Sequence, residues 1–112
     1  MSSAAGEVDR PDGTGSDANP ACGDRTTITL RVRDGVITEA RARTSGCEAA
    51  TAASLALAEA VTGMDAAAAA RISPNDLVQR LGTLPEEDWP CVRPAVGALR
   101  AALVDARIAL RR

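Results

Sequence analysis

The strongest structural signal in the chain is the segment TTITLRVRDGVITEARART, residues 26–44. In its first half Ile28, Leu30 and Val32 alternate with polar residues, a pattern typical of a strand with one buried face. Residues 36–44 repeat the alternation after a short break. The segment therefore predicts two antiparallel strands joined as a hairpin.

The break between the two strands contains Asp34-Gly35, a dipeptide common in hairpin turns. A two-residue loop there would place the apolar face of one strand beside the polar face of the other. We therefore predict a three-residue loop, residues 33–35, with Gly35 left-handed in a bulge. This loop aligns the apolar residues Ile28, Leu30 and Val32 with Val36, Ala40 and Ala42.

The outer face of the hairpin collects arginines. We expect a solvated sheet face there rather than a docking site for an acidic partner, because no aromatic side chains are interleaved with them. The chain carries 13 basic and 15 acidic residues, a net charge of -2, which does not favour nucleic acid or an anionic membrane as partner. The arginines are Arg31, Arg33, Arg41 and Arg43.

Upstream of the hairpin, residues 1–18 are rich in Gly, Ser, Asp and Ala and show neither helical nor strand periodicity. We predict a flexible polar tail there, with order beginning at Asn19-Pro20. The remaining residues, 19–112, form one domain, since 112 residues are too few for two cores.

Downstream of Gly46 the pattern changes to helices, because residues 48–61 are rich in Ala and Leu and are followed by Gly63. A hairpin followed by helices, without alternation of the two, predicts an α+β fold with the helices packed on one face of a small antiparallel sheet. The other expected elements are a short alanine turn capped by Asp65, a helix from Ser73-Pro74 to Gly82, a loop over residues 83–90, and a last helix with Val92, Val96, Leu99, Leu103, Ala106 and Leu110 on one face.

The core predicted from this composition is thin. Of the apolar residues 24 are alanines, and Trp89 is the single aromatic side chain. A protein with a small core usually needs a second source of stability, such as a metal or a partner. The longest apolar run, about residues 66–70, is far shorter than the roughly 20 residues of a membrane span, and the first residues do not resemble an export signal. We therefore expect a cytoplasmic protein whose three cysteines are thiols.

The three cysteines fall at the boundaries of the expected elements. Cys47 and Cys91 begin helices, whose free N–H groups and positive dipole end favour a negatively charged sulfur. Cys22 and Asp24 are one residue apart in an extended segment, so their side chains point the same way. Three thiolates and a carboxylate suit tetrahedral zinc or iron. The gaps of 25 and 44 residues lack the close pairs of zinc motifs, so three inert core cysteines are the alternative.

At these positions the chain resembles the NifU/IscU-type family of iron-sulfur cluster scaffolds, over about residues 19–112. It has Pro90 where the scaffold branch has His before its third cysteine, a departure shared with the zinc-binding SufU-like branch. The matching motifs are Asn19-Pro20-Ala21-Cys22-Gly23-Asp24, Ser45-Gly46-Cys47 with the small-residue helix behind it, and Ile72-Ser73-Pro74-Asn75-Asp76 through Leu81-Gly82-Thr83-Leu84-Pro85-Glu86-Glu87 to Cys91.

The resemblance implies a scaffold or sulfur acceptor without enzymatic turnover of its own. Its cargo would be a transient cluster, 2Fe-2S in type, or zinc in its place, with Cys22, Asp24, Cys47 and Cys91 as ligands. Cys91 and Cys22 are the candidate sulfur acceptors. The implied partners are a cysteine desulfurase and recipient apo-proteins, with no nucleic acid or membrane, and the expected state is a monomer or weak homodimer.

Two other hypotheses stay open from the sequence. In the first, the same four residues bind zinc permanently and stabilise a small interaction module. In the second, the chain is a degenerate paralogue that binds no metal. Metal content after anaerobic purification would separate the three hypotheses.

Overall fold

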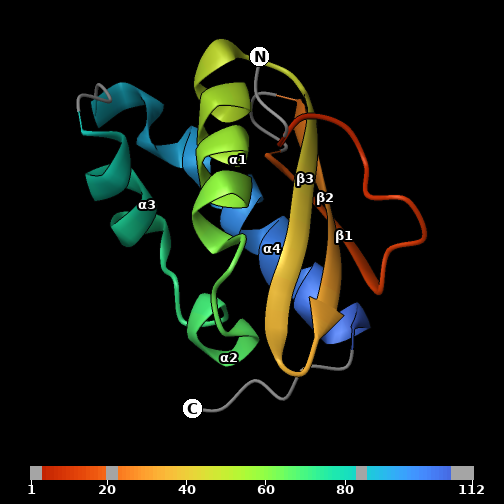
Figure 1. Ribbon diagram of the computed structural model, residues 1–112. Coiled ribbons are helices and arrows are strands. Elements are labelled where there is room, and N and C mark those ends of the chain that lie inside the picture. Colours follow the sequence, from red (N-terminus) through yellow and green to blue (C-terminus); the bar gives the residue numbers. More distant parts are fainter. Residues whose placement is uncertain (1–3, 20–22, 83–85, 107–112) are drawn as a thin grey trace.

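The computed structural model describes residues 4–19, 23–82 and 86–106, and shows one antiparallel sheet with helices on one face (Figure 1). The three strands lie in the order β1-β2-β3, which confirms the predicted α+β class. Helix α1 contacts β3, whereas α4 contacts β1 and β2. The elements are β1 (Gly13–Asn19), β2 (Asp24–Arg33), β3 (Val36–Ser45), α1 (Glu48–Val61), α2 (Ala66–Ala69), α3 (Pro74–Leu81), the 3-10 helix η1 (Glu86–Val92) and α4 (Arg93–Asp105).

The loop of the β2–β3 hairpin differs from the prediction. Arg33 pairs with Val36, so the loop has two residues and not three. Both loop residues have positive φ, 52° at Asp34 and 78° at Gly35, as the mirror-image turn of a two-residue hairpin requires. The predicted three-residue loop is therefore wrong.

A bulge farther along the hairpin resolves the register conflict that had argued against a two-residue loop. The register shifts between Arg31 and Val32, and the pairing passes over Thr38 on β3. One extra residue reverses which face the following side chains occupy. Near the turn Ile37 is therefore buried while Val36 is 36% exposed, contrary to prediction. Beyond the bulge the apolar residues of the two strands share one face, as predicted: Leu30 faces Ala40, and Ile28 faces Ala42.

The segment expected to be a flexible tail contains a strand instead. β1 pairs antiparallel with β2 from Gly13, opposite Leu30, to Asn19, opposite Asp24. A Cβ added at Gly13 or Gly15 would overlap the backbone of Ala102 in α4. The strand thus packs its own backbone against the helix and needs no apolar side chains, which is why the sequence shows no strand periodicity there.

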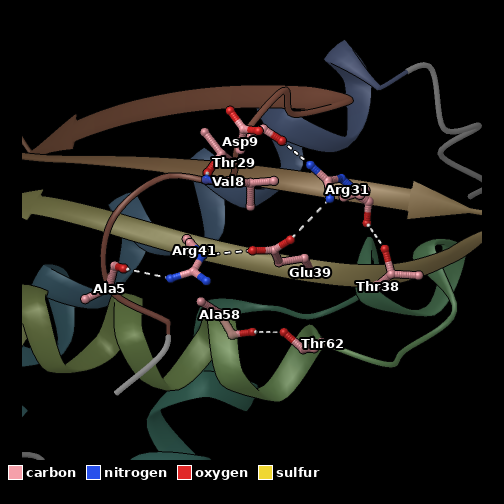
Figure 2. A network of polar contacts seen from close by, with 10 residues as sticks. All are labelled: Ala5, Val8, Asp9, Thr29, Arg31, Thr38, Glu39, Arg41, Ala58 and Thr62. Carbon is pink, nitrogen blue, oxygen red and sulfur yellow. Dashed lines mark hydrogen bonds and ion pairs between the residues drawn. The ribbon is translucent and has the colours of Figure 1, made fainter. Parts of the chain in front are cut away.

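The residues before β1 cross the outer face of the sheet (Figure 2). Ala4 and Gly6 exchange hydrogen bonds with Ala42 on β3, at 2.7 and 3.0 Å. Val8 is buried and donates its backbone N–H to the Thr29 hydroxyl over 2.8 Å. The outer face, expected to be solvated, is therefore partly covered by the chain itself.

Three of the four outer-face arginines bind this crossing segment. Arg41 donates to the Ala5 carbonyl over 3.4 Å, Arg31 donates to the Asp9 carbonyl, and Arg43 lies 3.2 Å from the Glu7 carboxylate. Figure 2 also shows Glu39 between Arg31 and Arg41, at 3.6 and 2.9 Å. These contacts hold the N-terminal segment on the sheet.

The helices begin where their capping residues predict. Cys47 is the N-cap of α1, and Ser73 with Asp76 forms a capping box at the start of α3. The expected loop before the last helix is different, because residues 86–92 form η1 and α4 begins at Arg93. Leu110, predicted to lie on the apolar face of that helix, is outside the described residues. Within the described chain, none of the helices combines the length and apolar character of a membrane span.

Candidate metal centre

Three potential ligand side chains from distant parts of the chain converge at one end of the sheet. Asp24 comes from the start of β2, Cys47 from the N-terminus of α1, and Cys91 from η1. One ligand atom from each lies within 4.8 Å of the other two. The structure thus brings together three of the four predicted ligands. The fourth, Cys22, lies outside the described residues and remains a prediction.

Asp24 is buried, with 2% of its surface exposed, on the face of β2 that also carries Ile28. Its Oδ1 accepts a hydrogen bond from the backbone N–H of Cys47 over 3.0 Å. Its Oδ2 lies 3.4 Å from the Cys47 sulfur. One oxygen thus orients the carboxylate while the other faces the thiol.

Gly46 is the residue that permits this close approach. Its φ is +154°, and a Cβ built on it would overlap the Asp24 carboxylate. The sequence motif contains Gly46, but its role as the gap for the carboxylate was not predicted. A glycine directly before a helix N-cap is the only signal of that role in the sequence.

Cys47 is exposed and caps α1 with its own side chain, its sulfur accepting from the Ala50 backbone N–H over 3.4 Å. The predicted position at a helix N-terminus is confirmed for this residue. The helix end directs N–H dipoles toward the sulfur, an arrangement that suits an anionic ligand.

Cys91 is nearly buried, with 7% exposure, and its sulfur lies 3.6 Å from that of Cys47. It does not begin α4 as predicted. It lies in the 3-10 turn before that helix, which starts at Arg93. The turn brings the Cys91 sulfur to that of Cys47.

The separations of the Cys47 sulfur from the other two donor atoms fit a single metal ion. Two sulfurs at about 2.3 Å from a tetrahedral ion lie about 3.8 Å apart, and a sulfur and a carboxylate oxygen about 3.5 Å apart. The observed distances are 3.6 Å between the sulfurs and 3.4 Å between the Cys47 sulfur and Asp24 Oδ2. Thiolates with one carboxylate suit zinc and iron rather than magnesium or calcium. The arrangement is therefore chemically competent to hold a thiophilic metal.

Residues 3–109 match the family model described as the NifU-like N terminal domain. The chain belongs to the NifU-like N-terminal domain family. The match extends over the segment that the sequence had placed in a tail, in agreement with the pairing of β1 in the sheet.

Two relatives are similar over most of this NifU-like chain. The iron-sulfur cluster assembly scaffold protein IscU 1 of Archaeoglobus fulgidus is 37% identical over 100 residues, which are 89% of this chain and 65% of that protein. The bifunctional protein NifU/MnmA of Rubrobacter xylanophilus is 42% identical over 103 residues, 90% of this chain and 21% of that protein. The chain therefore spans less than two thirds of either relative.

Two solved structures share the fold of this NifU-like domain. The putative scaffold protein for the SUF system from Fervidobacterium islandicum superposes with a TM-score of 0.61 at 18% identity, covering 99% of this chain and 89% of that one. The NifU-like protein of Brucella abortus superposes with a TM-score of 0.58 at 24% identity, covering 96% and 81%. The fold implied by the sequence resemblance is confirmed.

Proposed function

We propose that this protein is an iron-sulfur cluster assembly scaffold, which holds a transient cluster and passes it to apo-proteins. The observation that carries the proposal is the convergence of Asp24, Cys47 and Cys91 from three separate elements, with donor atoms within 4.8 Å. Two relatives that are 37% identical bear the name of such scaffolds. The cluster is cargo, so the domain needs a site that binds it and also releases it.

In the proposed centre Cys22 is the fourth ligand, and a cluster of 2Fe-2S type is the cargo. A diiron cluster takes four protein ligands, usually cysteines. The carboxylate of Asp24 is a harder and weaker donor than a thiolate toward such a centre. It is therefore the ligand that an incoming thiol displaces most readily.

Sulfur would arrive from a cysteine desulfurase as a persulfide. An acceptor thiolate attacks the outer sulfur of that persulfide, its S–S bond breaks, a new S–S bond forms on the acceptor, and the desulfurase regains its thiolate. Cys91 and Cys22 are the acceptors proposed from the sequence. The exposure of Cys47, against 7% for Cys91, adds Cys47 as a third candidate.

The rest of the proposal follows from the carrier role. The domain has no turnover of its own, acts in the cytoplasm as a monomer or weak homodimer, and exchanges cargo with the desulfurase and with recipient apo-proteins. A permanently bound zinc that stabilises a small interaction module is the competing function.

The deciding experiment is anaerobic reconstitution with ferrous iron, cysteine, a reductant and a cysteine desulfurase. A scaffold forms a coloured cluster with iron and sulfide in equal amounts, and mixing with apo-ferredoxin transfers it, as followed by circular dichroism. The same reaction without desulfurase is the control. A protein that keeps stoichiometric zinc throughout and never acquires sulfide would establish the zinc module instead.

A further inference from the structure

A chain of hydroxyl groups runs through the core beside the metal centre. The Thr26 and Thr44 hydroxyl oxygens are 3.2 Å apart, and those of Thr44 and Ser54 are 2.6 Å apart. Ser54 in turn donates to the Thr51 carbonyl over 2.9 Å. Thr26 and Ser54 are 0% and 1% exposed. These residues connect β2, β3 and α1 through side chains alone.

The hydrogen bonds in this chain run in one direction. A hydroxyl has a single proton to donate, and Ser54 uses its proton on the Thr51 carbonyl. Thr44 must therefore donate to Ser54, and Thr26 to Thr44. Thr44 and Ser54 each donate and accept one hydrogen bond in the series, whereas Thr26 only donates. Such a fully used series strengthens its members in a low-dielectric core.

Thr26 and Thr44 lie close in sequence to residues of the metal centre, and Ser54 is linked to it through Thr51. Thr26 follows Asp24 by two residues on the same face of β2, and Thr44 precedes Gly46 by two residues on β3. On α1, the Thr51 hydroxyl donates to the Cys47 carbonyl over 3.1 Å. The hydroxyl chain thus links the strand that carries Asp24 to the helix turn that carries Cys47.

Packing alone does not account for hydroxyls at these positions. The next inward-facing residues along the same elements are apolar, namely Ile28 on β2, Ala42 on β3 and Leu57 on α1. Valine has nearly the shape of threonine and needs no hydrogen-bond partner when buried. Three of the six buried residues of α1 are alanines, whose contact area is small. Directional hydrogen bonds resist sliding of such a helix better than alanine contacts do.

We propose that Thr26, Thr44 and Ser54 are positioning residues that hold the Cys47 sulfur in ligand distance of the Asp24 carboxylate and so set how tightly the centre retains metal. The biological meaning of this inference rests on the proposed function, whereas its test needs only a centre that binds metal. A site loosened by about 1 Å loses much of its binding capacity, and loss of such outer contacts costs about 10- to 100-fold in metal affinity.

The test is an anaerobic titration with Co²⁺, whose absorption reports thiolate ligation and tetrahedral geometry. Thr44→Val and Ser54→Ala should bind Co²⁺ about 10-fold or more weakly, with altered cobalt bands. Thr44→Ser keeps the hydroxyl and should restore the wild-type affinity and spectrum. Thr29→Val is the matched control, because Thr29 is also a buried, hydrogen-bonded threonine of β2 but faces away from the centre, toward Val8.

Melting curves of the metal-free variants separate positioning from stability. Thr26→Val and Thr29→Val should lower the melting temperature to similar extents, while Thr26→Val alone weakens Co²⁺ binding. The inference is overturned if the three chain variants bind Co²⁺ like the wild type, if Thr29→Val weakens binding equally, or if the wild type does not bind Co²⁺. A wild type that binds Co²⁺ but never acquires or transfers a cluster contradicts the proposed function and leaves this inference standing.

Discussion

The backbone N–H of Cys47 donates a hydrogen bond to the Asp24 carboxylate over 3.0 Å. The contact joins the first residue of a strand to the N-cap of a helix that lies 23 positions farther along the chain. It leaves the second carboxylate oxygen facing the Cys47 sulfur at 3.4 Å. The fold thus orients this ligand pair.

Gly46→Ala should disrupt this pair. The added methyl group would overlap the Asp24 carboxylate, so either the carboxylate or the start of α1 must move, and we expect Co²⁺ affinity to fall about 10-fold or more. Gly63→Ala is the matched control, since Gly63 also has positive φ, +90°, but has open space around it. The control should lose about 1 kcal/mol of stability from backbone strain and keep its metal affinity. Equal affinities for all three proteins would contradict this account of Gly46.

Asp24→Ala and Asp24→Cys should both slow cargo release, for different reasons. Removing the carboxylate should leave sulfur acceptance partly intact while slowing cluster release, because the exchangeable ligand is gone. A thiolate in its place should hold the cluster more tightly and transfer it more slowly. Transfer to apo-ferredoxin, followed by circular dichroism, measures both. Asp105→Ala is the control, because Asp105 lies at the far end of α4, where it accepts the Thr14 N–H. Wild-type transfer rates in both Asp24 variants would show that Asp24 is not the ligand exchanged during release.

Cys47→Ser and Cys91→Ser should each abolish tight metal binding. A neutral hydroxyl does not replace a thiolate toward a soft or borderline metal. Cys22→Ser should have the same effect if Cys22 is the fourth ligand. Metal content after anaerobic purification and dialysis measures each variant. If Cys22→Ser alone keeps the wild-type metal stoichiometry, the fourth ligand is another residue. If Cys47→Ser or Cys91→Ser keeps it, the proposed metal centre is wrong.

Metal removal should lower the melting temperature. Ligand at 100 times its dissociation constant stabilises the native state by about 2.7 kcal/mol, which corresponds to about 10 °C for a domain of this size. Calorimetry with and without chelator provides the measurement. Cys47→Ser serves as the control, because it should melt at one temperature in both conditions. Identical curves for the wild type would indicate a core complete without metal.

The capping box of α3 should make stability depend on pH at the acidic end. A hydrogen bond from the Ser73 backbone N–H, with a smaller contribution from the Ser73 side chain, lowers the pKa of Asp76 below its ordinary 3.8. Because the native pKa is the lower one, ionised Asp76 stabilises the fold above about pH 4. That stabilisation is lost as the pH falls through the native pKa. Asp76→Asn should therefore melt below the wild type at pH 7 and approach it near pH 2; a constant difference would refute this assignment.

Local chemistry along the chain was sufficient to predict the starts of α1, α2 and α3 and the buried face of β2. Cys47, Asp65 and Ser73 cap the helices that follow them, because caps act within one turn. Ile28 and Leu30 lie on the buried face of β2, because alternation has a period of two residues wherever one face is buried. The resemblance at the cysteine motifs identified the family, since those motifs carry side chains with specific chemistry.

Three features depend on contacts between distant segments, and the first two were missed or mispredicted. The bulge at Thr38 allows the hairpin to keep its two-residue turn and still bury Ile37. No local sequence pattern predicts such a bulge. β1 is stabilised where the backbone at Gly13 and Gly15 meets α4, so its residues have no apolar signature. The centre itself exists only because the start of β2, the start of α1 and the 3-10 helix η1 meet at one place. Residue types along the chain named its candidate ligands, whereas packing of the sheet against the helices set the distances that let Asp24, Cys47 and Cys91 share one ion.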